Sequence, residues 1–159
     1  MDTGDATQTG GRLRRVARYV EDGPFCMTYG DGVADVNIAA ELEFHRAHGR
    51  KATMTVVPPP ARFGGVVVKG DRIEHFEEKP LAGGGLINGG FFVLSPEVID
   101  LIDGDDTAWE RGPLESLAAA SDLACWRHEG FWQPMDTLRE KDYLESLWER
   151  GEAPWRTWM

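Results

Sequence analysis

Residues 25–32 read FCMTYGDG. A short apolar run that ends at turn residues is typical of a strand buried on both faces, as in a parallel sheet. Ligands of open α/β sheets bind beyond the carboxyl ends of such strands, which is where Asp31 would lie. The glycines on either side of Asp31 let a ligand or other backbone come close. The stretch predicts a strand that delivers one carboxylate to a site, and the alternative is a solvated turn aspartate.

Strands and helices alternate along the rest of the chain, and this alternation predicts an α/β fold with a mostly parallel sheet. Gly70-Asp71 is expected to join one antiparallel hairpin. Asp35 or Asn37 would cap the second helix, and Thr137 with Glu140 forms a capping box for the last one. The expected helices span residues 12–20, 38–48, 96–103, 113–120 and 138–150, and the expected strands span 25–29, 51–57, 65–69, 72–76, 86–94 and 123–128.

The composition restricts the classes of protein that need to be considered. The chain has 159 residues, enough for one domain with a real core, and carries 27 acidic against 17 basic residues, a net charge of −10. This balance argues against nucleic-acid binding. No apolar run reaches membrane-spanning length and no signal-peptide pattern opens the chain, so a cytoplasmic protein is expected. Cys26 and Cys125 are expected to be buried free thiols.

Asp136 is the second carboxylate of interest, because it directly precedes the capped helix in a loop that follows a strand. Two carboxylates from separate strand ends, Asp31 and Asp136, could hold one Mg²⁺ and leave its other positions to phosphate oxygens and water. The alternative for Asp136 is an ordinary Asx turn or cap. His45 and His48 share a helix but lack a third ligand, so no histidine metal site is expected.

Three further segments could bind a ligand. Glu78-Lys79-Pro80 offers a cation for a phosphate and a carboxylate for hydroxyl groups, or it is a surface ion pair. Asn88-Gly89-Gly90 offers an amide for sugar hydroxyls, although a β-bulge explains its glycines equally well. Arg12 follows Gly10-Gly11 at an expected helix start, where anions are attracted, whereas the other arginines of that helix are expected to be solvated.

In order along the chain, these segments resemble one family, the sugar-nucleotide pyrophosphorylases, which are nucleotidyltransferases, and within it the glucose-1-phosphate cytidylyltransferase branch. FWQPMDT and INGGFFV are specific to that branch more than to the wider family. The resemblance covers nearly the whole chain. The matching segments are TGGRL (9–13), TYGDGVAD (28–35), FHRAHGRKAT (44–53), ARFG (61–64), FEEKP (76–80), INGGFFVLSPEVIDLID (87–103) and GFWQPMDTLREKDYLESLWERGEAPW (130–155).

The resemblance implies a Rossmann-like sheet with helices on both faces, and the conversion of CTP and glucose 1-phosphate into CDP-glucose and pyrophosphate. It implies that Asp31 and Asp136 hold Mg²⁺ and are catalytic together with Lys79. The glucose 1-phosphate would be held by Glu78, Lys79, Asn88 and Gly89, with Lys79 on the phosphate. Positioning and charge neutralisation would supply most of the catalysis.

The resemblance covers fewer of the family's nucleotide-binding motifs. Gly10, Gly11 and Arg12 would lie against the cytosine or the ribose. Family members open with a GGxGTR loop and a catalytic lysine, and this sequence contains neither. We therefore expect residues 1–159 to form a single partial nucleotidyltransferase domain, incomplete at its N-terminus, that forms a homo-oligomer. The alternative is a non-catalytic sugar-phosphate-binding or assembly module that needs a partner chain.

Overall fold

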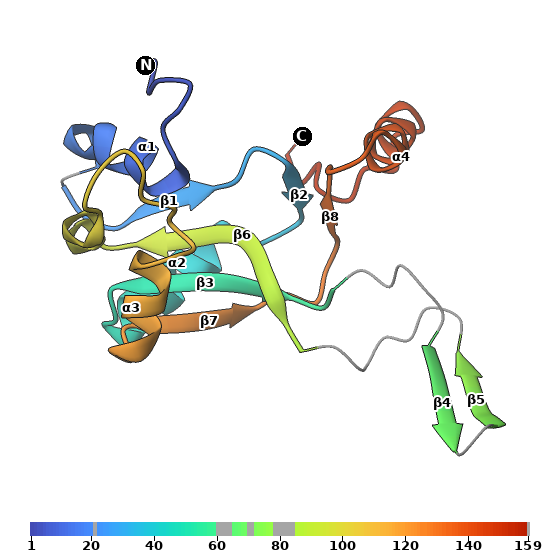
Figure 1. Cartoon of the computed structure of the whole chain (residues 1–159). Coiled ribbons are helices and arrows are strands. Elements are labelled where there is room, and N and C mark those ends of the chain that lie inside the picture. The colour runs from blue at the N-terminus through green and yellow to red at the C-terminus, as the bar shows by residue number, and fades with distance from the viewer. Residues whose placement is uncertain (21, 60–64, 70–71, 78–84, 159) are drawn as a thin grey trace.

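A computed structural model of the chain describes residues 1–20, 22–59, 65–69, 72–77 and 85–158. Its centre is a four-stranded sheet in the order β1-β6-β3-β7 (Figure 1). The expected α/β class is confirmed. The strands of this sheet are β1 (Phe25–Thr28), β3 (Ala52–Val57), β6 (Ile87–Leu94) and β7 (Leu123–Arg127).

Three of these strands run in one direction and β6 runs against them. β3 and β7 pair in parallel, whereas β6 pairs antiparallel with both β1 and β3. Most strands thus run in the same direction, as expected for a mostly parallel sheet. Two of the three pairings between neighbouring strands are nevertheless antiparallel. The described part of the connection from β3 to β6 holds the hairpin of β4 (Gly65–Lys69) and β5 (Arg72–Glu77) and no crossover helix, and a parallel neighbour needs such a crossover.

The prediction that the first strand is buried on both faces is wrong. β1 lies at the edge of the sheet, and its residues alternate between half-buried and exposed. Phe25 and Met27 pack against the core, while Cys26 and Thr28 point to the other face. Cys26 and Cys125 are both free, as expected, but both are exposed. The apolar run signalled a strand correctly, yet it could not reveal how many neighbours the strand has.

Helices cover the two faces of the sheet, as the family resemblance implied (Figure 1). One face packs against α1 (Thr9–Arg15), the 3-10 helix η2 (Pro96–Leu101) and α3 (Pro113–Ala119), and α2 (Ile38–His48) covers the other. The core lies on the first face, where Phe92 contacts the fully buried Trp109 at 6.0 Å between ring centroids. Its other members include Leu13, Ala52, Leu94, Val98, Ile102, Leu114 and Leu117.

The contact between α2 and β3 is polar and buried. Thr55 Oγ1 donates a hydrogen bond of 2.8 Å to Glu41 Oε1, and burial raises the pKa of Glu41. Nδ1 of the buried His45 lies 2.9 Å from Thr53 Oγ1, and burial lowers the pKa of His45. Asn37, one of the two expected caps, accepts the N–H of Ala40.

The first helix begins earlier than predicted. α1 starts at Thr9 rather than at residue 12, and residues 17–19 form a separate 3-10 turn, η1 (Ala17–Tyr19). Gly10 and Gly11 belong to the first turn of α1 because this turn docks on the 105–109 segment. Gly11 N–H donates to Thr107 O at 3.2 Å, and the N–H of Gln8 donates to Asp105 O at 2.9 Å.

A second, two-stranded sheet is formed by β2 (Gly32–Ala34) and β8 (Trp132–Pro134), which pair antiparallel. Neither β2 nor β8 is among the strands that the sequence pattern predicted. Directly beyond β8, the capping box of Thr137 and Glu140 opens α4 (Leu138–Glu149), as expected.

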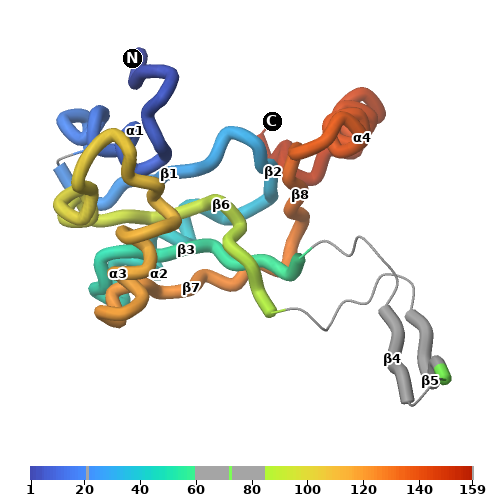
Figure 2. Tube along the Cα trace, viewed as in Figure 1, coloured from blue at the N-terminus to red at the C-terminus, as the bar shows by residue number. Residues whose placement is uncertain are grey.

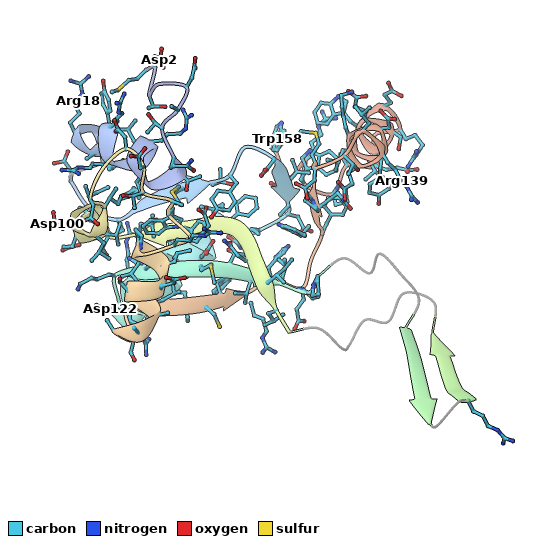
Figure 3. All side chains as sticks on the ribbon, viewed as in Figure 1. Asp2, Arg18, Asp100, Asp122, Arg139 and Trp158 are labelled. Carbon is cyan, nitrogen blue, oxygen red and sulfur yellow. The ribbon has the colours of Figure 1, made fainter. Side chains whose placement is uncertain are left out.

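The two termini lie on the same side of the molecule, the N-terminus beside α1 and the C-terminus beside β2 and β8 (Figure 2). In the tail, Trp155 packs on Phe131 at 5.4 Å between ring centroids, whereas Trp158 is 58% exposed (Figure 3). No helix among the described residues is long and apolar enough to cross a membrane.

Candidate active site

The β2–β8 ladder brings the two predicted carboxylates to the same end. Gly32 pairs with Pro134, and the N–H of Met135 donates a 2.6 Å hydrogen bond to the carbonyl oxygen of Asp31. Asp31 therefore lies one residue before β2, and Asp136 lies two residues after β8. In an antiparallel pair the start of one strand lies beside the end of the other, so both residues lie at the same end of the ladder. Both residues are exposed.

The capping box of α4 fixes the backbone at Asp136. Glu140 Oε2 accepts the N–H of Asp136 at 3.0 Å and the N–H of Thr137 at 2.9 Å. Asp136 thus occupies a defined position at the start of α4, where the exposed N–H groups and the helix dipole favour negative charge.

A β-bulge places Asn88 beside this ladder. Between Met54 and Val56 the pairing of β3 with β6 shifts by two residues, and the extra residues are those around Gly89 and Gly90. The bulge, which was the alternative explanation of these glycines, is present, and the binding of sugar hydroxyls by Asn88 stays a prediction. Trp132 Nε1 donates to Gly89 O at 2.7 Å and so ties β8 to the bulge.

A small pocket of about 40 Å³ lies where the bulge and the ladder meet. Asp31, Asn88 and Gly89 all line it, together with Trp132 and Pro134 of β8. The structure thus brings together three of the predicted site residues, from segments far apart in the sequence. Glu78 and Lys79, the predicted phosphate and sugar contacts, lie outside the described residues.

A larger pocket of about 590 Å³ adjoins the same end of β1. Asp31 and Arg12 both line it, so Arg12 faces a cavity that the first carboxylate shares. The Arg12 guanidinium donates to Thr3 Oγ1 at 2.7 Å and to Asp5 O at 3.2 Å. These two bonds tie the Arg12 side chain to the N-terminal segment. Arg18, by contrast, lies on the outer side of that segment, as a solvated arginine would (Figure 3).

Gly10 and Gly11 are buried in α1 and do not line this pocket. A Cβ atom at Gly10 would lie 2.7 Å from Thr107 O, and one at Gly11 would lie 2.5 Å from Asp105 O. Both glycines are therefore required by close packing of α1 on the 105–109 backbone. Their contact with a nucleotide remains a prediction.

The donor set at the ladder end suits Mg²⁺. Among the described residues no cluster of three or more histidine, cysteine or acidic side chains forms a closed metal cage. Mg²⁺ is usually held by one or two carboxylates and keeps its other positions for substrate phosphates and water. Two exposed carboxylates beside a helix start fit that pattern, and they do not fit a site that is complete with protein ligands alone.

Sequence reasoning gave no role to two residues of the site, Tyr29 and Glu110. Tyr29, directly before Gly30-Asp31, donates its hydroxyl to Glu110 Oε1 at 2.6 Å, and burial raises the pKa of Tyr29, with the Glu110 hydrogen bond adding to the shift. Glu110 is 81 residues away in sequence, and no motif marks it. Tyr29 could have been flagged by its position at the end of the strand that delivers Asp31.

Comparisons with known proteins identify the family of this chain. The nucleotidyl transferase family model matches residues 7–129. Glucose-1-phosphate cytidylyltransferases of Salmonella typhimurium and Salmonella typhi are each 58% identical to this chain over 159 residues, which is 99% of the chain and 62% of each relative. This identity confirms the resemblance to that branch. The chain thus spans less than two thirds of the length of these relatives.

A crystal structure of HddC from Yersinia pseudotuberculosis shares the fold, with a TM-score of 0.62 and 19% identity. The match covers 88% of this chain and 62% of that one. At this level of identity the likeness concerns the arrangement of helices and strands alone.

Proposed function

The chain belongs to the nucleotidyl transferase family, and we propose that it acts in the transfer of a cytidylyl group from CTP to glucose 1-phosphate, with release of pyrophosphate. The observation that carries the proposal is the β2–β8 pairing, which sets Asp31 and Asp136 at one ladder end beside the Asn88 pocket. The 58% identity to glucose-1-phosphate cytidylyltransferases supports this choice of nucleotide and sugar.

In this proposal the phosphate oxygen of the sugar attacks the α-phosphorus of CTP in line, and pyrophosphate leaves. Asp31 and Asp136 would hold Mg²⁺, which neutralises phosphate charge when bound. Lys79 would pair with the sugar phosphate, and Glu78, Asn88 and Gly89 would bind the sugar. The positions of Asn88 and Asp31 on one small pocket support this division of roles.

Calorimetric titration with glucose 1-phosphate tests the proposal. Binding is expected with Mg²⁺ present and is expected to weaken strongly in EDTA, because the phosphate would share the cation with two carboxylates. With Mg²⁺ present, Lys79→Ala should bind glucose 1-phosphate more weakly than the wild type. The control Lys141→Ala removes an exposed lysine paired with Glu145 on α4 and should bind it as the wild type does. Equal affinity with and without Mg²⁺ would contradict the proposal.

A second candidate is a non-catalytic sugar-phosphate-binding or assembly module that acts with a partner chain. Exposed large side chains on α4 and in the tail favour it: Leu138, Tyr143, Trp148 and Trp158 are 78%, 45%, 50% and 58% exposed. A homo-oligomer would cover this surface. Light scattering with a pyrophosphate-release assay separates the candidates, since a monomer that forms CDP-glucose would exclude the second one.

A further inference from the structure

A continuous chain of hydrogen bonds links the sugar side of the proposed site to helix α1. Asn88 Nδ2 lies 3.3 Å from the Tyr29 hydroxyl, which lies 2.6 Å from Glu110 Oε1. Glu110 Oε2 accepts from Thr9 Oγ1 at 2.9 Å, and Thr9 Oγ1 accepts the N–H of Trp109 at 2.8 Å. Neither Tyr29 nor Glu110 has a role in the function proposed above.

The donors and acceptors in this series of hydrogen bonds have one consistent arrangement. Burial of Glu110 acts against its charge, but hydrogen bonds from Tyr29, its own backbone and Thr9 outweigh it and lower the pKa of Glu110. Glu110 is therefore a carboxylate that only accepts, and the single hydroxyl proton of Tyr29 goes to it. The Tyr29 oxygen can then only accept from Asn88.

These constraints fix the orientation of the Asn88 amide. Its Oδ1 accepts the N–H of Gly90 at 2.8 Å, and its Nδ2 donates to Tyr29. A rotation that exchanged Oδ1 and Nδ2 would set two donors against each other at Gly90 and two acceptors at Tyr29. Among the described residues the other Nδ2 hydrogen has no acceptor, so it is left for a ligand in the small pocket that Asn88 and Asp31 line.

We propose that Tyr29 is a positioning residue that holds the Asn88 amide so that its second N–H is presented to a sugar oxygen, with Glu110 holding Tyr29. This inference rests on the proposed function, because it assigns the orienting partner of a predicted sugar-binding residue. A site built to hydrogen-bond a sugar loses affinity when its donor can rotate away.

The hydroxyl of Tyr29 can be removed without removing its ring. The ring packs on Phe92 at 5.6 Å between centroids, and a Cβ at Gly90 would lie 2.9 Å from the Tyr29 ring edge. These contacts do not involve the hydroxyl, so Tyr29→Phe keeps them. Tyr19→Phe is the matched control, since Tyr19 is 64% exposed and its hydroxyl contacts only Arg18 among the described residues.

The first readout is the side-chain NH₂ signal of Asn88 in ¹⁵N-labelled protein, assigned by its loss in Asn88→Ala. We expect a sharp, distinct pair of signals in the wild type, and shifted or exchange-broadened signals in Tyr29→Phe. Tyr19→Phe should leave them unchanged. An unaltered Asn88 pair in Tyr29→Phe would overturn the positioning role whether or not any sugar binds.

The second readout is the dissociation constant for glucose 1-phosphate with Mg²⁺, measured beside that for inorganic phosphate. Tyr29→Phe should weaken glucose 1-phosphate binding about tenfold, the worth of one hydrogen bond, and leave phosphate binding unchanged. In an Asn88→Ala background the same change should have no further effect. Equal weakening for both ligands, or additive effects in the double variant, would refute the inference.

Glu110 supplies a rescue test. Glu110→Ala should reproduce the weakening seen in Tyr29→Phe, whereas Glu110→Gln keeps an acceptor for the Tyr29 hydroxyl and should restore most of the affinity. A wild-type chain that binds no glucose 1-phosphate would refute the proposed function instead, and the Asn88 signals would then decide the positioning role alone.

Discussion

Replacing Gly11 with alanine would place a methyl group 2.5 Å from the carbonyl oxygen and 2.6 Å from the Cα atom of Asp105, where ordinary contact begins at 3.4 Å. The opposing backbone cannot give way easily, because Asp105 O accepts the N–H of Gln8 at 2.9 Å and its side chain is paired with Arg15. Overpacking of this kind costs about 1–3 kcal/mol. Alanine in a helix recovers about 1 kcal/mol relative to glycine.

The steric cost should win, because the clash is with backbone rather than with a flexible side chain. We expect Gly11→Ala to lower the free energy of unfolding by up to about 2 kcal/mol net. Urea denaturation followed by circular dichroism measures it. Gly104→Ala is the control, since a Cβ there meets nothing within 4 Å, and its effect should stay within about 0.5 kcal/mol.

The variant also separates the two roles that Gly11 could have. If close packing of α1 is the reason for this glycine, the stability falls. A Gly11→Ala chain that is as stable as the wild type but has lost CTP binding would refute the packing argument and favour direct nucleotide contact.

Three further predictions concern buried polar groups and a helix cap. Thr55→Val removes the described hydrogen-bond donor to the buried Glu41, whose other carboxylate oxygen already lacks a described partner, so the free energy of unfolding should fall by about 1–3 kcal/mol in urea titrations. The lowered pKa of His45 means that the unfolded chain binds a proton first as the pH falls. Stability should therefore drop from about pH 7 to about pH 5, and by less in His45→Gln, as urea titrations at both pH values would show. Thr137→Ala removes the N-cap of α4 and should cost about 1 kcal/mol, with faster amide hydrogen exchange confined to the start of that helix.

Local signals predicted much of this fold because they act over a few residues. The capping box of Thr137 and Glu140, the asparagine cap at Asn37 and the left-handed glycine at Gly49 each specify a helix end by their own hydrogen bonds or backbone angle. The Gly70-Asp71 pair likewise signalled the hairpin, whose two strands are present.

The parts of the fold that the sequence did not predict depend on contacts between distant segments. β2 and β8 have three residues each, too few to show an alternating pattern, and each includes a glycine or a proline. Only their pairing, about a hundred residues apart in sequence, makes them strands. The Tyr29–Glu110 bond and the edge position of β1 are of the same kind, since both follow from the tertiary fold rather than from neighbouring residues.

The central claim is that Asp31 and Asp136 hold one cation together at the end of the β2–β8 ladder. Titration with Mn²⁺, a spectroscopic substitute for Mg²⁺, measures this directly in the wild type, in Asp31→Asn, in Asp136→Asn and in the double variant, with glucose 1-phosphate present. Asp142→Asn, an exposed aspartate on α4, serves as the control. We predict that each single variant loses most of the affinity and that the double variant loses little more. Full affinity in either single variant, or independent and additive losses, would contradict the claim.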